Sequence, residues 1–295
     1  MPEGHVIHGQ ARRLARAFRG QVVRVDSPQG RFTEAGRVDG AVVHRAWARG
    51  KHLFVEFARQ DSANGRGSSA AHEPIVPTVP TVPTVPIVTL HVHLGLFGTW
   101  TFGSGAAPAV TGQVRCRIRT RERFAELRGP TVCELLDQQQ VDAVLQRIGP
   151  DPLHRAADPN RAWQRLQRSS APIGAALMDQ RTFAGVGNIY RAEVLFRHRM
   201  SPFRPARAVT REDFDALWQD LVHLMAQGAR RGRIDTVQPE HLPATMGRPT
   251  REDRHGGEVY VYRRAGQPCL LCSTPVSASS LQSRNLYWCP DCQAR

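Results

Sequence analysis

The sequence contains no run of about 18 apolar residues, so it offers no candidate for a transmembrane helix. Its first 20 residues lack the apolar stretch of a secretory signal peptide, and we therefore expect a cytoplasmic protein without a membrane partner. Cysteine is too scarce for a disulfide framework, with six in 295 residues. Since 41% of the residues are hydrophobic, a packed core is expected instead, with room for roughly two domains.

Acidic residues are also in short supply relative to basic ones. The chain has 26 Asp and Glu against 40 Lys and Arg, and arginine supplies nearly all of the basic residues, which leaves a formal net charge of +14. This excess favours a polyanionic partner, and nucleic acid above all. Because a GC-rich genome also enriches arginine, the charge alone does not decide the function.

The pattern along the chain predicts a mixed α+β, multidomain fold. Apolar residues at helical spacing predict an amphipathic helix over 6–20, and short β-rich runs follow at 21–57 and 87–120. These runs indicate a β-sandwich or barrel that ends at a linker near 121–131. Helical spacing then predicts helices over 132–148, 159–168, 172–179, 188–199 and 210–230.

Three domains are therefore expected, with one insertion. They are an N-terminal β-sandwich domain over 1–126, a helical domain over 127–262, and a cysteine-bearing segment of two hairpins over 263–295. Within the first domain, the triplet PTV occurs three times in tandem from Pro77 to Val85. Proline at every third position favours extended chain, so we interpret 58–86 as an insertion in a surface loop, or as a repeat expansion without a role.

Four of the cysteines form two closely spaced pairs near the C-terminus. Cys269 and Cys272 are followed, after 16 residues, by Cys289 and Cys292. Two such pairs can present four thiolates to one tetrahedral zinc ion, and a fully protein-ligated zinc is structural; a redox-active pair is the alternative. Outside these pairs, we interpret Cys116 and Cys133 as buried apolar residues rather than as catalytic thiols.

The loop between the two cysteine pairs carries Arg284 within the sequence Ser-Arg-Asn. An arginine on a rigid turn of a basic protein is a natural contact for a phosphate, although a solvated surface arginine would look the same in sequence. A second possible phosphate contact lies at Gly185-Val-Gly-Asn188, directly before a predicted helix. Glycines there can bring backbone N–H groups to an anion, and Asn188 can cap the helix or bind phosphate, but a plain tight turn explains the pattern equally well. A nucleotide P-loop is excluded because its lysine and its Ser/Thr are absent.

The N-terminus has a chemistry of its own. Met1 precedes Pro2, a small residue after which the initiator methionine is normally removed. A free N-terminal proline is a secondary amine, which can attack an aldehyde-like carbon and form a permanently charged iminium that drives elimination. Glu3, next to it, could act as the acid or base in such a reaction. Without further context, Met-Pro-Glu is also an ordinary N-terminus.

Five stretches in this order resemble one family, the formamidopyrimidine-DNA glycosylase / endonuclease VIII family of base-excision repair enzymes. They are PEG at 2–4, RGKHL at 49–53, GPDPL at 149–153, LMDQRTFAGVGNIYRAEVLF at 177–196, and the terminal CLLC…SRNLYWCPDCQ. The resemblance covers nearly the whole chain apart from the insertion. It implies a helix–two-turn–helix motif in the helical domain, a zinc-finger β-hairpin at the C-terminus, and a duplex lying in the cleft between the domains.

The resemblance also implies a role for individual residues. Pro2 would attack C1′ of the damaged nucleotide, and Glu3 would donate and accept protons as the sugar opens and the imine hydrolyses. Lys51 would help to protonate the sugar or would hold a phosphate beside it, whereas without the family it reads as a solvated turn lysine. Asn188 and Arg284 would grip the phosphates that flank the lesion.

A base-flipping enzyme must also fill the gap that the extruded nucleotide leaves in the duplex. The family places such residues on a loop after the strand TLHVHL, which makes Leu96 and Phe97 candidates; ordinary core residues near a turn are the alternative. DNA binding is expected to depend strongly on salt.

The sequence departs from the family at two places. The family commonly continues PEGPE, whereas this chain has His5 and Val6. Residues 231–258 do not match the loop that closes over an oxidised purine in one branch of the family. We therefore expect the endonuclease VIII-like, actinobacterial branch and a preference for oxidised pyrimidines.

The expected protein is a monomeric, bifunctional DNA glycosylase and abasic-site lyase with one structural zinc ion, acting in the bacterial cytoplasm on double-stranded DNA that contains oxidised bases or abasic sites. Two alternatives stay open. A non-catalytic damaged-DNA-binding paralogue would have the same fold but no need for Pro2, Glu3 and Lys51. An RNA-binding zinc-ribbon protein would explain the charge and the cysteines alone.

Overall fold

The protein is described here by a computed structural model that covers residues 2–58, 87–252 and 257–294. The predicted insertion at 58–86 therefore lies outside the described residues, apart from its first residue. Among the described residues, no helix is both long enough and apolar enough to cross a membrane.

The N-terminal part is a sandwich of two four-stranded antiparallel sheets, as the sequence predicts. One sheet has the strand order β2-β3-β4-β8 and the other the order β1-β6-β7-β5, and helix α1 (Gly4–Phe18) packs its apolar face, which includes Ile7, Leu14 and Phe18, into the core that the two sheets share. The strands are β1 Arg24–Asp26, β2 Val42–Arg49, β3 His52–Ala58, β4 Ile87–His93, β5 Thr99–Ser104, β6 Cys116–Arg119, β7 Arg123–Arg128 and β8 Val132–Leu136, with a 3-10 turn at Thr33–Arg37.

The predicted helix over 132–148 is wrong in its first half. Residues 132–136 form strand β8, which pairs with β4 in register Leu90↔Leu135, and the helix α2 spans only Gln138–Gln146. The two are separated by Asp137, whose side chain accepts from the N–H of Gln140 in a capping box. The expected linker near 121–131 is likewise wrong, because it holds β7 and the turn into β8, both parts of the sandwich.

The helical part follows the sequence prediction closely. The expected helices over 159–168, 172–179, 188–199 and 210–230 are present as α3 (Pro159–Gln167), α4 (Ile173–Ala176), α5 (Asn188–Arg197) and α6 (Arg211–Arg231), with 3-10 turns at Ala206–Ala208 and Pro239–His241 and the short α7 (Pro243–Met246). Their core is rich in fully buried aromatic side chains, Phe183, Phe196 and Phe214 among them. Such rings supply much of the apolar burial that holds short helices together.

The C-terminal part contains a single strand hairpin, β9 (Ser277–Leu281) with β10 (Arg284–Trp288), rather than two. Its two turn residues, Gln282 and Ser283, both have positive φ, as a type I′ turn requires. The first cysteine pair lies instead on a turn closed by an isolated bridge between Pro268 and Pro275.

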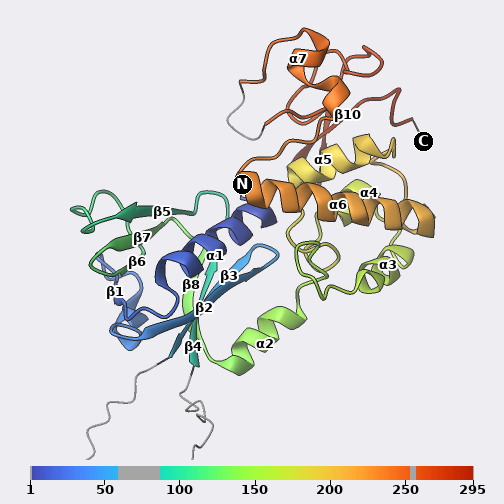
Figure 1. Cartoon of the computed structure of the whole chain (residues 1–295). Coiled ribbons are helices and arrows are strands. Elements are labelled where there is room, and N and C mark those ends of the chain that lie inside the picture. The colour runs from blue at the N-terminus through green and yellow to red at the C-terminus, as the bar shows by residue number, and fades with distance from the viewer. Residues whose placement is uncertain (1, 59–86, 253–256, 295) are drawn as a thin grey trace, which may run out of the picture.

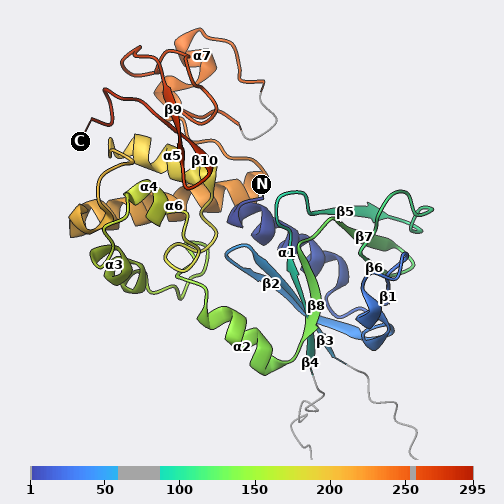
Figure 2. The ribbon, with the colours of Figure 1, turned by 180° about the vertical axis from the view of Figure 1, so that it is seen from behind.

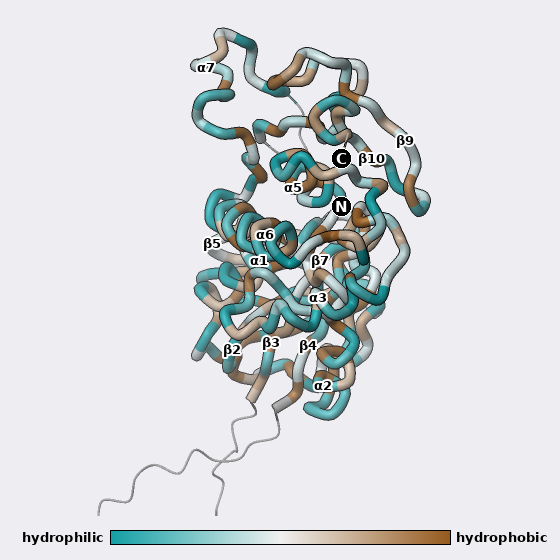
Figure 3. Tube along the Cα trace, turned by 90° about the vertical axis from the view of Figure 1, so that its right-hand side faces the viewer, coloured by the Kyte–Doolittle hydropathy of each residue, from teal (hydrophilic) through white to brown (hydrophobic). Residues whose placement is uncertain are grey.

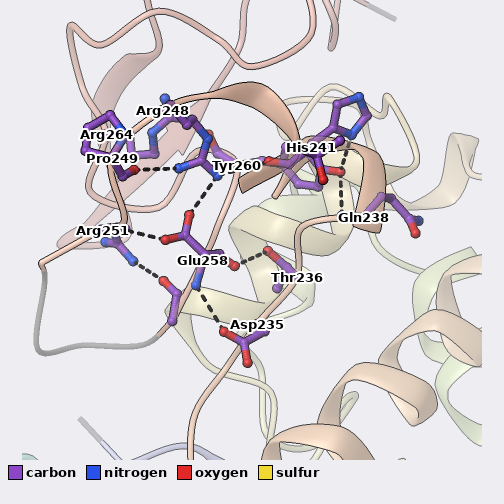
Figure 4. A network of polar contacts seen from close by, with 12 residues as sticks. Asp235, Thr236, Gln238, His241, Arg248, Pro249, Arg251, Glu258, Tyr260 and Arg264 are labelled. Atoms are coloured by element: carbon purple, nitrogen blue, oxygen red, sulfur yellow. Dashed lines mark hydrogen bonds and ion pairs between the residues drawn. The ribbon is translucent and has the colours of Figure 1, made fainter. Parts of the chain in front are cut away.

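A polar network centred on Glu258 connects the described residues of the segment 231–258 (Figure 4). Arg248 donates to its carboxylate at 2.7 Å, the N–H of Arg251 donates at 2.8 Å, and the N–H of Glu258 itself donates to Asp235. This segment is the one that could not be matched to a purine-capping loop. It includes α7, at the end of the molecule farthest from the sandwich (Figure 1).

The three parts follow one another along the long axis of the molecule. In Figure 3 the sandwich and α2 lie at the bottom, α5 and α6 in the middle, and α7 and β9 at the top, with hydrophobic and hydrophilic residues alternating along the tube. Helix α1 belongs to the sandwich by its core but also packs against α6. The N-terminus thereby comes to lie at the junction of the parts (Figures 1 and 2).

Candidate functional site

Glu3 begins helix α1 and points its carboxylate at the N-terminus of α5. Its Oε1 accepts from the N–H of Ile189 at 2.8 Å, and its Oε2 accepts from the N–H of Tyr190 at 3.4 Å. A Cβ on Gly187 would lie 2.3 Å from Cδ of Glu3, so only glycine leaves room for this approach. The anion at this helix N-terminus is therefore the carboxylate of Glu3, which the glycine turn of the sequence could not identify.

The environment of Glu3 favours its protonated form. The side chain is 2% exposed, and burial raises the pKa of its carboxyl above the usual value of 4.5. The positive charge of Lys51 and the two helix N–H groups lower the pKa in part, but burial outweighs them. Pro2, which precedes Glu3, is half-buried at the same place. A carboxyl whose pKa is raised by burial thus lies beside the N-terminal residue.

Lys51 enters the site on the tight turn between β2 and β3. Gly50, with φ +57°, makes this turn, and a Cβ there would lie 2.9 Å from Cβ of Ala184, so the turn packs closely against the loop before α5. The Lys51 side chain is only 7% exposed. Burial lowers the pKa of its ammonium to about 8; Arg284 lowers it further and Glu3 opposes the shift. The interpretation of Lys51 as a solvated lysine is therefore wrong.

Asp151, in the GPDPL stretch, fixes this turn in place. It is fully buried and accepts from the N–H of Gly50 at 2.7 Å, from Nε2 of His8 at 2.8 Å and from the N–H of Leu153 at 2.8 Å. Burial alone would raise the pKa of its carboxyl, but the His8 contact and the two N–H groups outweigh it, and the pKa is lowered. Asp151 thereby links α1, the β2–β3 turn and the start of the helical part.

Replacing Asp151 by asparagine is expected to destabilise the protein by about 2–3 kcal/mol, because the charge-assisted hydrogen bonds to His8 and Gly50 are lost or weakened. Chemical denaturation at pH 7 measures this difference. Since the pKa of this carboxyl is depressed on folding, the wild-type advantage should be present above its unfolded pKa and should vanish as the pH falls through the folded value. An advantage that stays constant as the pH falls below the unfolded pKa would contradict this account.

A cleft of about 740 Å³ opens in front of Lys51 and is lined from three sides. Lys51 and His93 come from the sandwich, residues 165–182 from the helical part, and Gln282 and Arg284 from the C-terminal hairpin. Its basic lining residues are Lys51, Arg165, Arg168, Arg191 and Arg284, against a single acidic one, Asp179. This lining suits a phosphate backbone.

Asn188 and Arg191 tie the start of α5 to the C-terminal hairpin. Nδ2 of Asn188 donates to the carbonyl of Asn285 at 2.9 Å, Arg191 donates to the same carbonyl at 2.9 Å, and Arg191 also contacts Oδ1 of Asn188. Asn188 does not cap α5, because the capping position is occupied by Gly187. Arg191, which is 1% exposed, was not singled out in the sequence although it lies one helical turn after Asn188.

Three other predicted residues are presented to solvent. Arg284 begins β10 with its side chain exposed along the cleft. Leu96 and Phe97 lie in the turn between β4 and β5 and are 56% and 87% exposed, so they are not core residues. A phenylalanine this exposed on a turn is unusual for a monomer and indicates a contact surface.

The four cysteines predicted to bind metal converge on one point. The Sγ atoms of Cys269, Cys272, Cys289 and Cys292 all lie within 4.8 Å of one another. Individual Sγ–Sγ distances of 3.4, 3.5 and 3.9 Å are close to the edge of about 3.8 Å that a tetrahedron with Zn–S bonds of about 2.3 Å would have. The residues present therefore fit a tetrahedral metal ion. Cys116 is fully buried in the sandwich core and Cys133 packs against it half-buried, as expected.

Comparison with known proteins gives relatives over the full length of the chain. The family model described as the H2TH domain of formamidopyrimidine-DNA glycosylase matches residues 148–239. The chain is 46% identical to endonuclease 8 1 of Mycobacterium tuberculosis, covering 99% of this chain and 100% of the relative. It is also 31% identical to the formamidopyrimidine-DNA glycosylase of Thermus thermophilus, covering 99% and 98%.

Solved structures agree with this similarity. The chain superposes on the MutM (Fpg) protein of Thermus thermophilus with a TM-score of 0.69 and 27% identity, covering 100% of this chain and 99% of that one. It superposes on the Fpg protein of Lactococcus lactis, solved with DNA containing N7-benzyl-Fapy-dG, with a TM-score of 0.73 and 19% identity over the full length of both chains. The second likeness concerns the fold alone.

Proposed function

The chain belongs to the formamidopyrimidine-DNA glycosylase / endonuclease VIII family, and on that basis we propose that it is a bifunctional DNA glycosylase and abasic-site lyase of base-excision repair, acting at the bacterial nucleoid. The observation that carries the proposal is the pair formed by Glu3 and Lys51. Both are buried and close enough for each to shift the pKa of the other, and Glu3 directly follows Pro2 in the chain; the pKa of the acid is raised while that of the base is lowered to about 8. A neighbouring acid and base whose pKa values are shifted in these directions are typical of acid–base catalysis.

The proposed reaction begins when the amine of Pro2 attacks C1′ of the damaged nucleotide. The bond between C1′ and the base breaks, the sugar ring opens, and the departing groups take up protons that Glu3 and Lys51 are placed to supply. The resulting iminium withdraws electrons, so that loss of a proton from C2′ leads to β-elimination, which breaks the 3′ C–O bond. Loss of a proton from C4′ then leads to δ-elimination, which breaks the 5′ C–O bond, and a phosphate leaves in each step. Water, activated by Glu3, then hydrolyses the iminium and releases Pro2.

The remaining predicted residues bind the DNA in this proposal. Asn188 and Arg284 would hold the phosphates on either side of the lesion, since both lie at the meeting point of α5 and the C-terminal hairpin. Leu96 and Phe97 would enter the gap left by the flipped nucleotide, which their exposure on the β4–β5 turn permits. The cysteine cluster would hold one structural zinc ion, which keeps β9 and β10 in position behind Arg284.

We propose oxidised pyrimidines as the preferred substrates. The 46% identity to a protein named endonuclease 8 1 supports this branch of the family. The segment 231–258 also supports it, because its sequence does not match the loop that closes over an oxidised purine in one branch of the family. The DNA-bound form would be a monomer, since one chain forms the whole cleft.

Borohydride trapping tests the proposal unusually cleanly in this protein. Borohydride reduces an iminium to a stable amine, and the sequence contains only one lysine, Lys51, so that the protein offers two amines in all: the N-terminal one and Lys51. Duplexes carrying an abasic site, thymine glycol or 8-oxoguanine would be tested, with the intact mass measured to verify loss of Met1. We expect a crosslink on Pro2, strongest for the abasic site and stronger for thymine glycol than for 8-oxoguanine.

The matched control is Lys51→Arg, which leaves the N-terminal amine as the sole candidate. A crosslink that persists in this variant must lie on Pro2, whereas one that disappears together with a mapped Lys51 adduct would overturn the assignment of the nucleophile. Absence of any crosslink, with Met1 removed and metal bound, would favour the non-catalytic DNA-binding paralogue. A preference for single-stranded RNA would favour the RNA-binding alternative.

The pH dependence of base release should report on Lys51. Its charged form is the one that donates a proton or holds a phosphate, and its pKa in the folded protein is about 8. The rate constant at subsaturating DNA is therefore expected to fall as the pH rises through about 8. In Lys51→Arg the fall should be absent up to pH 10, because a guanidinium does not lose its proton there, even though the rate itself is lower. An unchanged alkaline limb in that variant would assign it to another group.

A further inference from the structure

A second basic groove lies between α1 and the C-terminal end of α6, away from the catalytic cleft. Its volume is about 490 Å³, and it is lined by five arginines, namely Arg12, Arg13, Arg16, Arg230 and Arg231, together with His5 and other uncharged residues. No acidic residue lines it, and it shares no lining residue with the cleft in front of Lys51. Helices α1 and α6 lie in front in Figure 1, whereas the hairpin that carries Arg284 lies in front of α5 in Figure 2.

Four of the five groove arginines, Arg12, Arg13, Arg16 and Arg230, form no ion pair among the described residues. Elsewhere, arginines pair with nearby carboxylates, as Arg24 does with Asp39 at 2.8 Å and Arg211 with Asp215 at 2.8 Å. Within the described part of the chain, the only ion pair of the groove is a loose one of 3.5 Å between Arg231 and Asp235. What distinguishes the groove is that five arginines line one hollow that no acidic residue lines.

His5 is the histidine that lines the groove. Its ring is 5% exposed, lines the groove and packs edge-on against Tyr190, yet its Nδ1 is buried without a hydrogen-bond partner among the described residues. Burial, with His8, lowers the pKa of His5 to about 4, so the ring is neutral at pH 7 and carries one N–H to donate. Buried polar atoms are rarely left unpaired. Oε1 of Gln10, also unpaired, is an acceptor and calls for a water molecule there.

The spacing of the arginines fits a nucleic-acid backbone better than a small anion. Arg12 and Arg16 are one helical turn apart on α1, which is about 6 Å along the helix. Alternate phosphates of one DNA strand repeat at about 6.8 Å along the duplex axis. A single phosphate would need one or two cations, whereas five cations on both walls of a groove suit several phosphates of one strand.

We propose that this groove binds the sugar–phosphate backbone of a second DNA segment while the catalytic cleft holds the first. Binding would involve phosphates alone, and therefore would not depend on sequence or lesion. A protein with two such sites can pass from one segment to another without entering free solution, which would shorten the search for rare lesions. The inference rests on the proposed function only in taking DNA as the occupant of the cleft.

The experiment fills the cleft first and then probes the groove. The protein is crosslinked by borohydride to a short abasic duplex, purified, and titrated with a fluorescent undamaged duplex at several salt concentrations. Three proteins are compared: wild type, the groove variant Arg12→Gln/Arg16→Gln/Arg230→Gln, and a control with the same change of charge, Arg147→Gln/Arg155→Gln/Arg207→Gln. The control arginines are exposed and line neither the groove nor the cleft.

We expect the crosslinked wild type and the control to bind the second duplex, and the groove variant to bind it at least tenfold more weakly. The slope of log K against log salt should fall in magnitude by about 3 in the groove variant, since three phosphate contacts are lost. Its rate of base release from a short duplex should stay unchanged. A crosslinked wild type that binds no second duplex, or a groove variant that binds like the control, would overturn the proposal.

Two further outcomes distinguish a second DNA site from an acidic protein partner and from a failure of the proposed chemistry. Tighter binding of poly-glutamate than of duplex by the crosslinked protein would assign the groove to an acidic protein partner and would reject DNA. Failure to crosslink would count against the proposed chemistry. The second site would then be tested by native mass spectrometry of the untreated proteins with undamaged duplex. Two duplexes on wild type and one on the groove variant support the second site, whereas one duplex on both rejects it.

Discussion

Replacing Pro2 by alanine is expected to slow both base release and strand cleavage by at least about 10³-fold, a loss of the size seen when a covalent nucleophile is removed. Alanine leaves a primary amine, whose imine is neutral unless it is protonated and therefore lacks the permanent charge of the proline iminium. Affinity for an abasic duplex should stay within about twofold, because Pro2 is small and half-buried while the phosphate contacts lie elsewhere. Single-turnover cleavage and fluorescence anisotropy measure the two quantities.

Glu3→Gln is the matched control for this variant. Glutamine keeps an oxygen for the N–H of Ile189 but cannot act as an acid or base, so it should form the iminium poorly while folding normally. Strand cleavage at the wild-type rate by Pro2→Ala, with Met1 removed in both proteins, would reject Pro2 as the nucleophile.

Loss of the cysteine cluster is expected to have a large effect on DNA binding rather than on the rate of the reaction. In Cys289→Ser the cluster of four thiolates is broken, and structural zinc sites contribute about 10–16 kcal/mol of apparent binding free energy that would no longer hold the hairpin. Arg284 then loses its fixed position on β10, and the carbonyl of Asn285 loses its place against Asn188 and Arg191. We expect a fall in affinity for abasic duplex of at least 10²-fold.

Metal analysis and thermal unfolding distinguish this explanation from general misfolding. The wild type should contain one zinc ion per chain and the variant none, while the sandwich, whose core shares no residue with the hairpin, should keep its own unfolding transition. The control Cys116→Ala removes a buried thiol of the sandwich and should leave the metal content at one. Full metal content or full affinity in Cys289→Ser would contradict the assignment.

Most elements were predictable from the sequence because their apolar residues repeat with a single period. Helix α1 is the clearest case, with Ile7, Leu14 and Phe18 on its buried face. Strand β8 was missed because Leu135 and Leu136 are adjacent, and a buried pair of this kind fits a helix as well as a strand near the core. Only its pairing with β4, some 40 residues earlier, decides between them, and the signal that was available is the capping residue Asp137.

The reaction site was predictable only as separate residues. The composition alone singles out Lys51 more clearly than the RGKHL motif does, because Lys51 is the sole lysine among 40 basic residues. Arginine can replace lysine in most phosphate contacts but cannot be brought to a pKa of about 8, which is a physical reason for this one exception. Asp151 gave no such signal, because its partners His8 and Gly50 lie 143 and 101 residues away in the chain. Nothing in the local sequence brings these three together.

The N-terminal residues depend on parts of the chain that are made last. The Glu3 carboxylate is held by Ile189, the Lys51 turn by Asp151, and the cleft in front of them is closed by Arg284. A ribosome adds about 5–20 residues per second, so a nascent chain carries its exposed proline for roughly 10 seconds or more before Arg284 is synthesised. During that time Arg284 is absent and the cleft is incomplete. The N-terminal residues therefore reach their folded surroundings only when nearly the whole chain has been made.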